Sequence, residues 1–87
     1  MTPRITISTS SQGTLEIAVN PSGRDKLVAL LQSLSNQNEH FHLAPAEIGM
    51  DCDLSEVPYN SQDQIVTFAK VLYRSDEWDE EHFPHVL

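Results

Sequence analysis

Residues 4–19 read RITISTSSQGTLEIAV, and the spacing of apolar residues in this stretch decides the fold predicted for the N-terminal half. Apolar side chains occupy every second position near both ends, namely Ile5, Ile7, Leu15, Ile17 and Val19. A period of two is typical of half-buried β-strands. The polar connection between them ends in Gly13 and has the length of a hairpin loop. The two strands are therefore predicted to pair antiparallel, with both apolar faces toward one core.

One amphipathic helix is predicted from Asn20 to about Ser35. Its leucines recur at the spacing that places side chains on one helical stripe, at Leu27, Leu30, Leu31 and Leu34. Ser22 with Asp25 three residues later resembles a capping box, and Asn20 before Pro21 is an alternative start. The result is a helix that packs on a sheet.

The second half of the chain is predicted to add two strands. Residues 40–43 alternate histidines with apolar residues, so the apolar pair faces the core and Pro45 closes the strand. Residues 65–74 carry apolar groups on both faces, which is typical of a central strand. Residues 44–63 contain five acids and are predicted to form a long loop, either continuous or broken by a short element, and connections of this length are often functional.

Together these elements predict a single small α+β domain spanning residues 1–87, since 87 residues supply one small core. The order is ββαββ, a four-stranded, mostly antiparallel sheet with the one amphipathic helix on one face. Residues 75–87 are predicted to form an acidic tail outside the regular elements. The uncovered sheet face would be polar or used in association.

Charge is distributed unevenly along the chain. Residues 39–87 hold eleven of the thirteen acids and only two bases, Lys70 and Arg74. Such a field repels phosphate backbones and anionic membranes and attracts basic proteins. The sequence therefore predicts a protein-binding protein with a basic partner, and no nucleic-acid or membrane partner.

The expected compartment is the cytoplasm. The first residues lack the basic and apolar stretches of a secretory signal, and no apolar run approaches membrane-spanning length. Cys52 is the single cysteine and cannot form an internal disulfide. Since it lies between two aspartates, its thiol pKa should be raised, which argues against a nucleophile and favours a buried or half-buried loop residue.

The acids of the second half form two candidate contact segments. Residues 76–81 place five acids around Trp78, and interfaces combine buried aromatic anchors with complementary charge. The competing interpretation is a solvated, frayed end whose tryptophan folds back on the sheet. The predicted partner-binding residues, including those of the acidic loop, are Asp51, Asp53, Glu56, Tyr59, Asp76, Glu77, Trp78, Asp79, Glu80 and Glu81.

No catalytic residue and no cofactor is predicted. The chain has no Gly-x-Ser-x-Gly turn and no Gly-rich phosphate loop. His40 and His42 point to the same side of their predicted strand and could share a metal ion, with Asp51, Asp53 or Glu39 completing the ligands. A pair of strand histidines is more often solvent-facing than metal-binding, so the chain is not predicted to be an enzyme.

Three stretches resemble a known family in order, spacing and residue type. They are Glu39-His40-Phe41-His42-Leu43-Ala44-Pro45, Leu54-Ser55-Glu56 and Phe68-Ala69-Lys70-Val71-Leu72-Tyr73-Arg74. They resemble the immunity-protein family numbered thirty-two of bacterial polymorphic toxin systems, over roughly residues 27–74. Family members carry a Trp-Gly-Gly-like loop where this chain has residues 47–50.

The resemblance implies a small cytoplasmic protein that binds a cognate toxin and occludes its active or substrate-binding surface. Two alternatives remain open from the residues. One is a metal-dependent enzyme that uses His40 and His42. The other is a structural or oligomeric accessory module, such as a homodimer through the uncovered sheet face.

Overall fold

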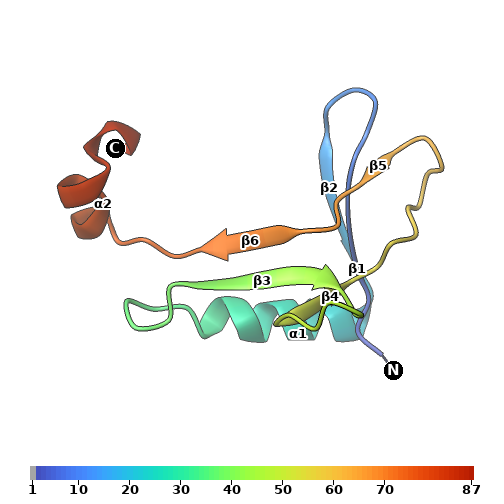
Figure 1. The fold of residues 1–87 in the computed structure, drawn as a ribbon, viewed down its shortest axis with the longest axis horizontal. Helices are drawn as coiled ribbons and strands as arrows, with labels where there is room; N and C mark the ends of the chain where they lie inside the picture. Colours follow the sequence, from blue (N-terminus) through green and yellow to red (C-terminus); the bar gives the residue numbers. More distant parts are fainter. Residues whose placement is uncertain (1) are drawn as a thin grey trace.

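The computed structural model describes residues 2–87 and shows an α+β fold in which two helices accompany two sheets of three strands each (Figure 1). In chain order the elements are β1 (Ile5–Thr9), β2 (Leu15–Val19), α1 (Pro21–Gln32), β3 (His40–Pro45), β4 (Cys52–Leu54), β5 (Gln64–Ile65), β6 (Ala69–Leu72), α2 (Asp76–His82) and the 3-10 turn η1 (Pro84–Val86). Across residues 2–87, neither helix has the length and apolar character needed to span a bilayer.

The first sheet has the strand order β2-β1-β5. Strands β1 and β2 pair antiparallel, with Ile5 opposite Val19, which confirms the predicted hairpin. Gly13 has a φ of 85° in the connecting turn, a left-handed conformation that glycine adopts without strain. The other edge of β1 is covered by the short strand β5, with Ser8 opposite Ile65.

The second sheet has the strand order β4-β3-β6. Strand β3 is central: it pairs antiparallel with β6, with His40 opposite Leu72, and parallel with β4, with Leu43 opposite Cys52. The predicted ββαββ arrangement with one four-stranded sheet is therefore corrected to two separate sheets. Strand β4, of three residues, is a short element of the kind that the prediction allowed within the loop of residues 44–63.

The prediction of one central strand over residues 65–74 was wrong. This segment is divided between the two sheets, because β5 ends at Ile65 on the first sheet and β6 begins at Ala69 on the second. Between them the backbone N–H of Val66 donates to the carbonyl of Ile7 at 2.8 Å. The segment carries apolar groups on both faces because it passes from one sheet to the other.

Helix α1 begins at the alternative start that the sequence offered. Asn20 is its N-cap, and the Asn20 Oδ1 atom accepts from the backbone N–H of Gly23 at 2.7 Å and of Arg4 at 2.9 Å. The Asn20 side-chain amide also donates to the carbonyl of Thr2 at 2.9 Å. The helix ends at Gln32, three residues before the predicted end, and it lies along β3 (Figure 1). Asn20 thus joins the start of the chain to the start of α1.

The core lies where the two sheets and α1 meet. Its buried apolar side chains are Ile5, Ile7, Phe41, Leu43, Cys52 and Leu54, and those packed against them are Leu27, Leu30, Leu34, Val66, Ala69 and Val71. The apolar residues of β2 remain outside, since Leu15 is 60% exposed and Ile17 is 53% exposed. The prediction that both apolar faces of the hairpin turn toward one core is confirmed in direction, since Ile17 lies opposite Ile7 on the same side of the sheet, but only the face of β1 is buried.

Candidate protein-binding site

Helix α2 carries most of the predicted contact residues, and its existence corrects the expectation of an acidic tail without regular structure. Ser75 is the N-cap, and its hydroxyl accepts from the backbone N–H of Trp78 at 3.1 Å. Asp76, Glu77 and Asp79 lie in the first turn, where negative charge is stabilised by the helix dipole. A serine followed by acids is itself a helix-start signal, so the sequence did contain the information.

The side chains of α2 divide into two faces. The aromatic face consists of Trp78, His82 and the following Phe83. The His82 ring stacks on the Trp78 ring with centroids 4.1 Å apart and an interplanar angle of 16°, and the Phe83 ring lies 5.5 Å from the Trp78 ring. The acidic face consists of Asp76, Glu77 and Glu80, which are exposed and which helical spacing places away from Trp78.

Arg74 connects α2 to the second sheet. Its guanidinium carbon lies 4.5 Å from the centroid of the Trp78 ring, and its Nη1 atom lies 3.4 Å from Oε2 of Glu39. Trp78 is half-buried, and its ring contacts Arg74, His82 and Phe83. Because Arg74 is already engaged by Glu39 and Trp78, the acidic face keeps its negative charge.

A second group of acids lies around β4. The Asp51 carboxylate accepts from the backbone N–H of His42 at 2.8 Å and lies 4.0 Å from the Nδ1 atom of the same residue. The side chain of Glu47 raises the pKa of Glu56, first through a hydrogen bond and then through like charge. The loop acids are thus held partly by local interactions.

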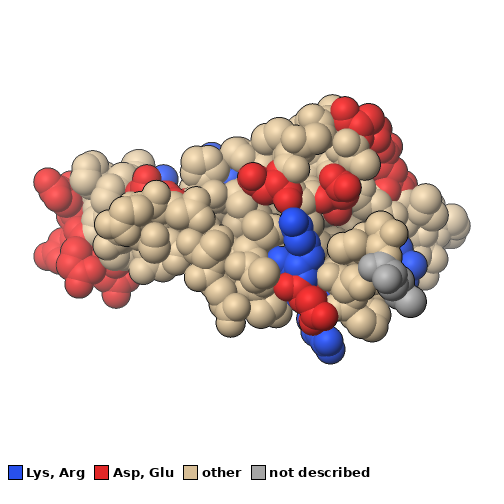
Figure 2. Space-filling view, turned by 90° about the horizontal axis from the view of Figure 1, so that it is seen from below, with Lys and Arg blue, Asp and Glu red and all other residues tan. Residues whose placement is uncertain are grey.

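The predicted contact residues do not form one continuous surface. Strand β3 begins beside α2, where His40 pairs with Leu72, and ends at Pro45 opposite Leu54 in β4. Figures 1 and 2 show α2 and its acids at one end of the molecule, with mostly uncharged surface between them and the acids over the other half. Tyr59 lies elsewhere again, in a hollow shared with Ser11 of the β1–β2 turn.

His40 and His42 lie on the same side of β3, outside the core, as predicted. Their ring centroids are 5.0 Å apart in an edge-to-face arrangement. Within residues 2–87, no group of three or more His, Cys, Asp or Glu side chains is placed to hold a metal ion.

Cys52 is buried, and it lies in β4 rather than in the predicted loop. Burial is the largest cause that raises the pKa of its thiol, and the charges of Asp53 and Asp51 act in the same direction while Lys26 opposes them. The raised thiol pKa agrees with a structural role for this residue, although the leading physical cause is desolvation rather than adjacent charge.

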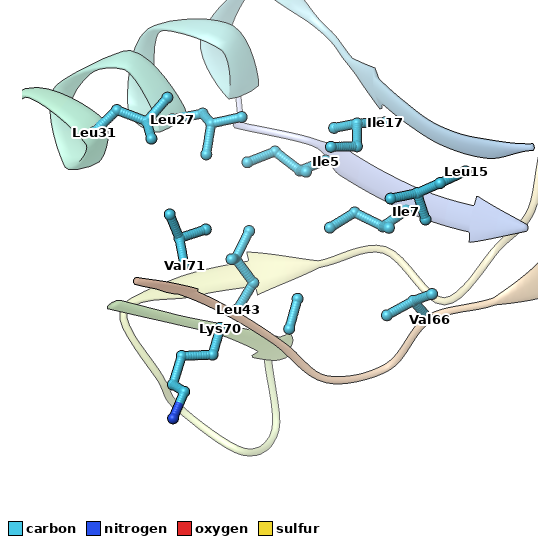
Figure 3. Close-up of a pocket in the computed structure, with 11 residues that line it drawn as sticks. Ile5, Ile7, Leu15, Ile17, Leu27, Leu31, Leu43, Val66, Lys70 and Val71 are labelled. Carbon is cyan, nitrogen blue, oxygen red and sulfur yellow. The ribbon is translucent and has the colours of Figure 1, made fainter. Parts of the chain in front are cut away.

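A feature that the sequence did not predict is an apolar groove between the two sheets. Its volume is about 350 Å³. Figure 3 shows Ile5, Ile7 and Ile17 on one wall and Leu43 and Val71 on the other, with the side chain of Lys70 pointing away from the cavity. The groove opens onto the exposed apolar face of β2, so apolar surface continues from the core to the outside of the molecule.

Comparisons with protein-family models, with curated proteins and with solved structures returned no match to this chain. Functional inference therefore depends on the two features that the geometry sets apart. One is the acidic face of α2, and the other is the apolar groove.

Proposed function

We propose that this chain is a small immunity protein of the bacterial cytoplasm that binds a basic toxin and occludes its active or substrate-binding surface. The observation that carries the proposal is the position of α2. This helix projects beyond the end of the second sheet and presents its acidic face to solvent (Figure 1).

Electrostatics supports a basic partner. The chain has a net charge of −8, and five of its acids lie within or beside two turns of α2. A concentrated field of one sign accelerates the encounter with a partner of opposite charge, by roughly 10- to 1,000-fold. Carboxylates spaced along a helix can also occupy positions that phosphates of a nucleic-acid substrate would take on a basic enzyme. Occlusion of such a site follows from binding alone and requires no catalytic group.

The contact surface should extend beyond α2. A standard interface covers about 800 Å² on each partner, or about 20 to 30 residues, which exceeds what one short helix offers. The neighbouring outer side of the strand that contains β6 supplies exposed apolar groups at Phe68, directly before β6, and at Leu72. We therefore expect the toxin to contact the acidic face of α2 and this side of β6 together.

The test is a comparison of charge-neutralised variants. The first changes the acids of α2: Asp76→Asn, Glu77→Gln, Asp79→Asn, Glu80→Gln and Glu81→Gln. The control changes three loop acids at the other end of the sheet, Glu47→Gln, Asp53→Asn and Glu56→Gln, and a three-site α2 variant, Asp76→Asn, Glu77→Gln and Glu80→Gln, matches it in charge. Circular dichroism checks that each variant folds.

The binding partner in this test is the toxin encoded beside the gene of this chain. Stopped-flow association at several salt concentrations should show that the α2 variant binds more slowly, with a flatter salt dependence, while the loop variant keeps most of its rate. Unchanged association of the α2 variant at low salt would exclude α2 from the interface. A gene neighbourhood without a toxin would count against the immunity role as a whole.

A further inference from the structure

Among residues 2–87, two surfaces present apolar side chains that stay largely exposed within the protomer. The first is the groove between the sheets together with the β2 face, where Leu15 and Ile17 are more than half exposed. The second belongs to the C-terminal arm, which we define as residues 75–87. Phe83 is 47% exposed, Val86 is 58% exposed and Leu87 is 63% exposed. The arm packs mainly on itself, α2 against η1.

The protomer is less compact than a typical monomeric domain of its size. Its radius of gyration is 14.8 Å, whereas a compact domain of 87 residues has a radius of about 12 Å. Its accessible surface is 6143 Å², whereas a compact monomer of 9.8 kDa exposes roughly 5,200 Å². The excess is close to the ~800 Å² that each partner buries in a standard interface.

We infer that two copies of this chain exchange their arms, so that the aromatic face of α2 and the apolar end of η1 in each copy occupy the groove of the other. One chain supplies both complementary surfaces, and a two-fold axis lets each copy give and receive one arm, so the assembly closes at two. Aromatic side chains seated in an apolar groove are typical anchors of an interface.

The charge distribution fits this arrangement. The acidic face of α2 points away from Trp78, so it stays in solvent when the aromatic face is buried. Lys70 lines the rim of the groove with its aliphatic stem while its ammonium group points away from the cavity (Figure 3), so the side chains that line the groove place no charge in it. The dimer would then display two acidic faces. The inference of a dimer goes beyond the proposed function and does not depend on it.

The first test measures mass and tryptophan environment together on the full-length chain. Sedimentation equilibrium from low micromolar to millimolar concentration should show a species of twice the 9.8 kDa chain mass. Trp78 is the single tryptophan, so its emission should shift to shorter wavelength as the dimer forms. A species of one chain mass at all concentrations would overturn the inference. This holds also for a monomer whose arm occupies the groove of its own chain.

Point variants separate arm exchange from other modes of association. Leu15→Glu places a charge in the groove and should raise the dimer dissociation constant about 30-fold or more. The matched control is Val57→Glu, because Val57 is 73% exposed and lies outside the groove and the arm. The double variant Phe83→Ser, Val86→Ser removes the apolar side chains of the arm and should weaken the dimer in the same way.

Mixing the two weakened variants gives the decisive result. A Leu15→Glu chain keeps its arm and a Phe83→Ser, Val86→Ser chain keeps its groove, so the mixture should form a heterodimer with one intact contact. If the mixture stays monomeric, or if either variant dimerises as tightly as the unchanged chain, arm exchange is refuted. Neutralising the acidic face should leave the dimer intact. The α2 charge variants therefore test the toxin-binding role, and the groove and arm variants test the dimer, so that one proposal can fail without the other.

Discussion

Replacing Asn20 by alanine should weaken the connection between the start of the chain and α1. Asn20 is 8% exposed, and its side chain makes three hydrogen bonds, with Thr2, Arg4 and Gly23. Alanine would remove the acceptor of two backbone N–H groups and the donor to one carbonyl. The Gly23 bond is buried and the Arg4 bond is partly buried, so water replaces them incompletely.

The expected loss of unfolding free energy is about 3 kcal/mol. Removal of an N-cap side chain costs about 1 kcal/mol, and the Arg4 N–H left without its acceptor at a partly buried site adds roughly 1 to 3 kcal/mol. The aspartate variant is the control, because its carboxylate still accepts from Arg4 and Gly23. Asn20→Asp loses only the bond to Thr2, and the charge at the helix N-terminus offsets part of that, so its loss should stay below about 1 kcal/mol.

Urea denaturation followed by far-ultraviolet circular dichroism measures both variants, since the single tryptophan lies on the arm and does not report on this site. The denaturation midpoint should fall for Asn20→Ala with little change in slope, because the same surface is exposed on unfolding. Two results would refute the reasoning. One is an alanine variant within 1 kcal/mol of the unchanged chain, and the other is an aspartate variant as unstable as the alanine variant.

Two further predictions concern the buried centre of the molecule. Gly23→Ala would place a Cβ atom against the carbonyl of Arg4, so urea denaturation should show a loss of about 1 to 3 kcal/mol despite the better helix propensity of alanine, and a stabilised variant would contradict this. Burial raises the pKa of the Cys52 thiol, so the folded state binds this proton more tightly than the unfolded state. The contribution of Cys52 to the free energy of unfolding is therefore fully present below the ordinary thiol pKa and falls as the pH rises above about 8.5. Cys52→Ala should lack this decline, and rapid labelling of the native thiol would disprove the buried site.

Local periodicity predicted the elements whose partners are close in sequence. The hairpin of β1 and β2 follows from alternation on either side of a short turn, and α1 follows from its leucine spacing. The division of residues 65–74 between two sheets could not be found in this way. An apolar pattern on both faces is the same for a central strand and for a segment that crosses between sheets, and only the distant partners, β1 and β3, distinguish them.

The residues of the candidate protein-binding site could be predicted from the sequence more fully than the elements and cavities that they form. The acids around Trp78 were identified from the sequence, but their helix was not predicted, although Ser75 before a run of acids is typical of a helix start. The contact of Arg74 with Trp78 has the four-residue spacing that a helical turn brings together. The groove could not be predicted, because alternation shows which face of β2 is apolar and says nothing about what covers it. Leu15 and Ile17 have the same pattern as Ile5 and Ile7, which are buried.

The pairing of β1 with β5 affects the order in which the chain can fold during synthesis. Strand β1 leaves the ribosome well before its partner, because Ser8 meets Ile65 and the carbonyl of Ile7 accepts from Val66, which are synthesised much later. Until then one edge of the hairpin has unpaired backbone groups that can join another nascent chain. Slow synthesis of the second half should therefore favour aggregation, and chaperones that shield strand edges should raise the yield of folded protein.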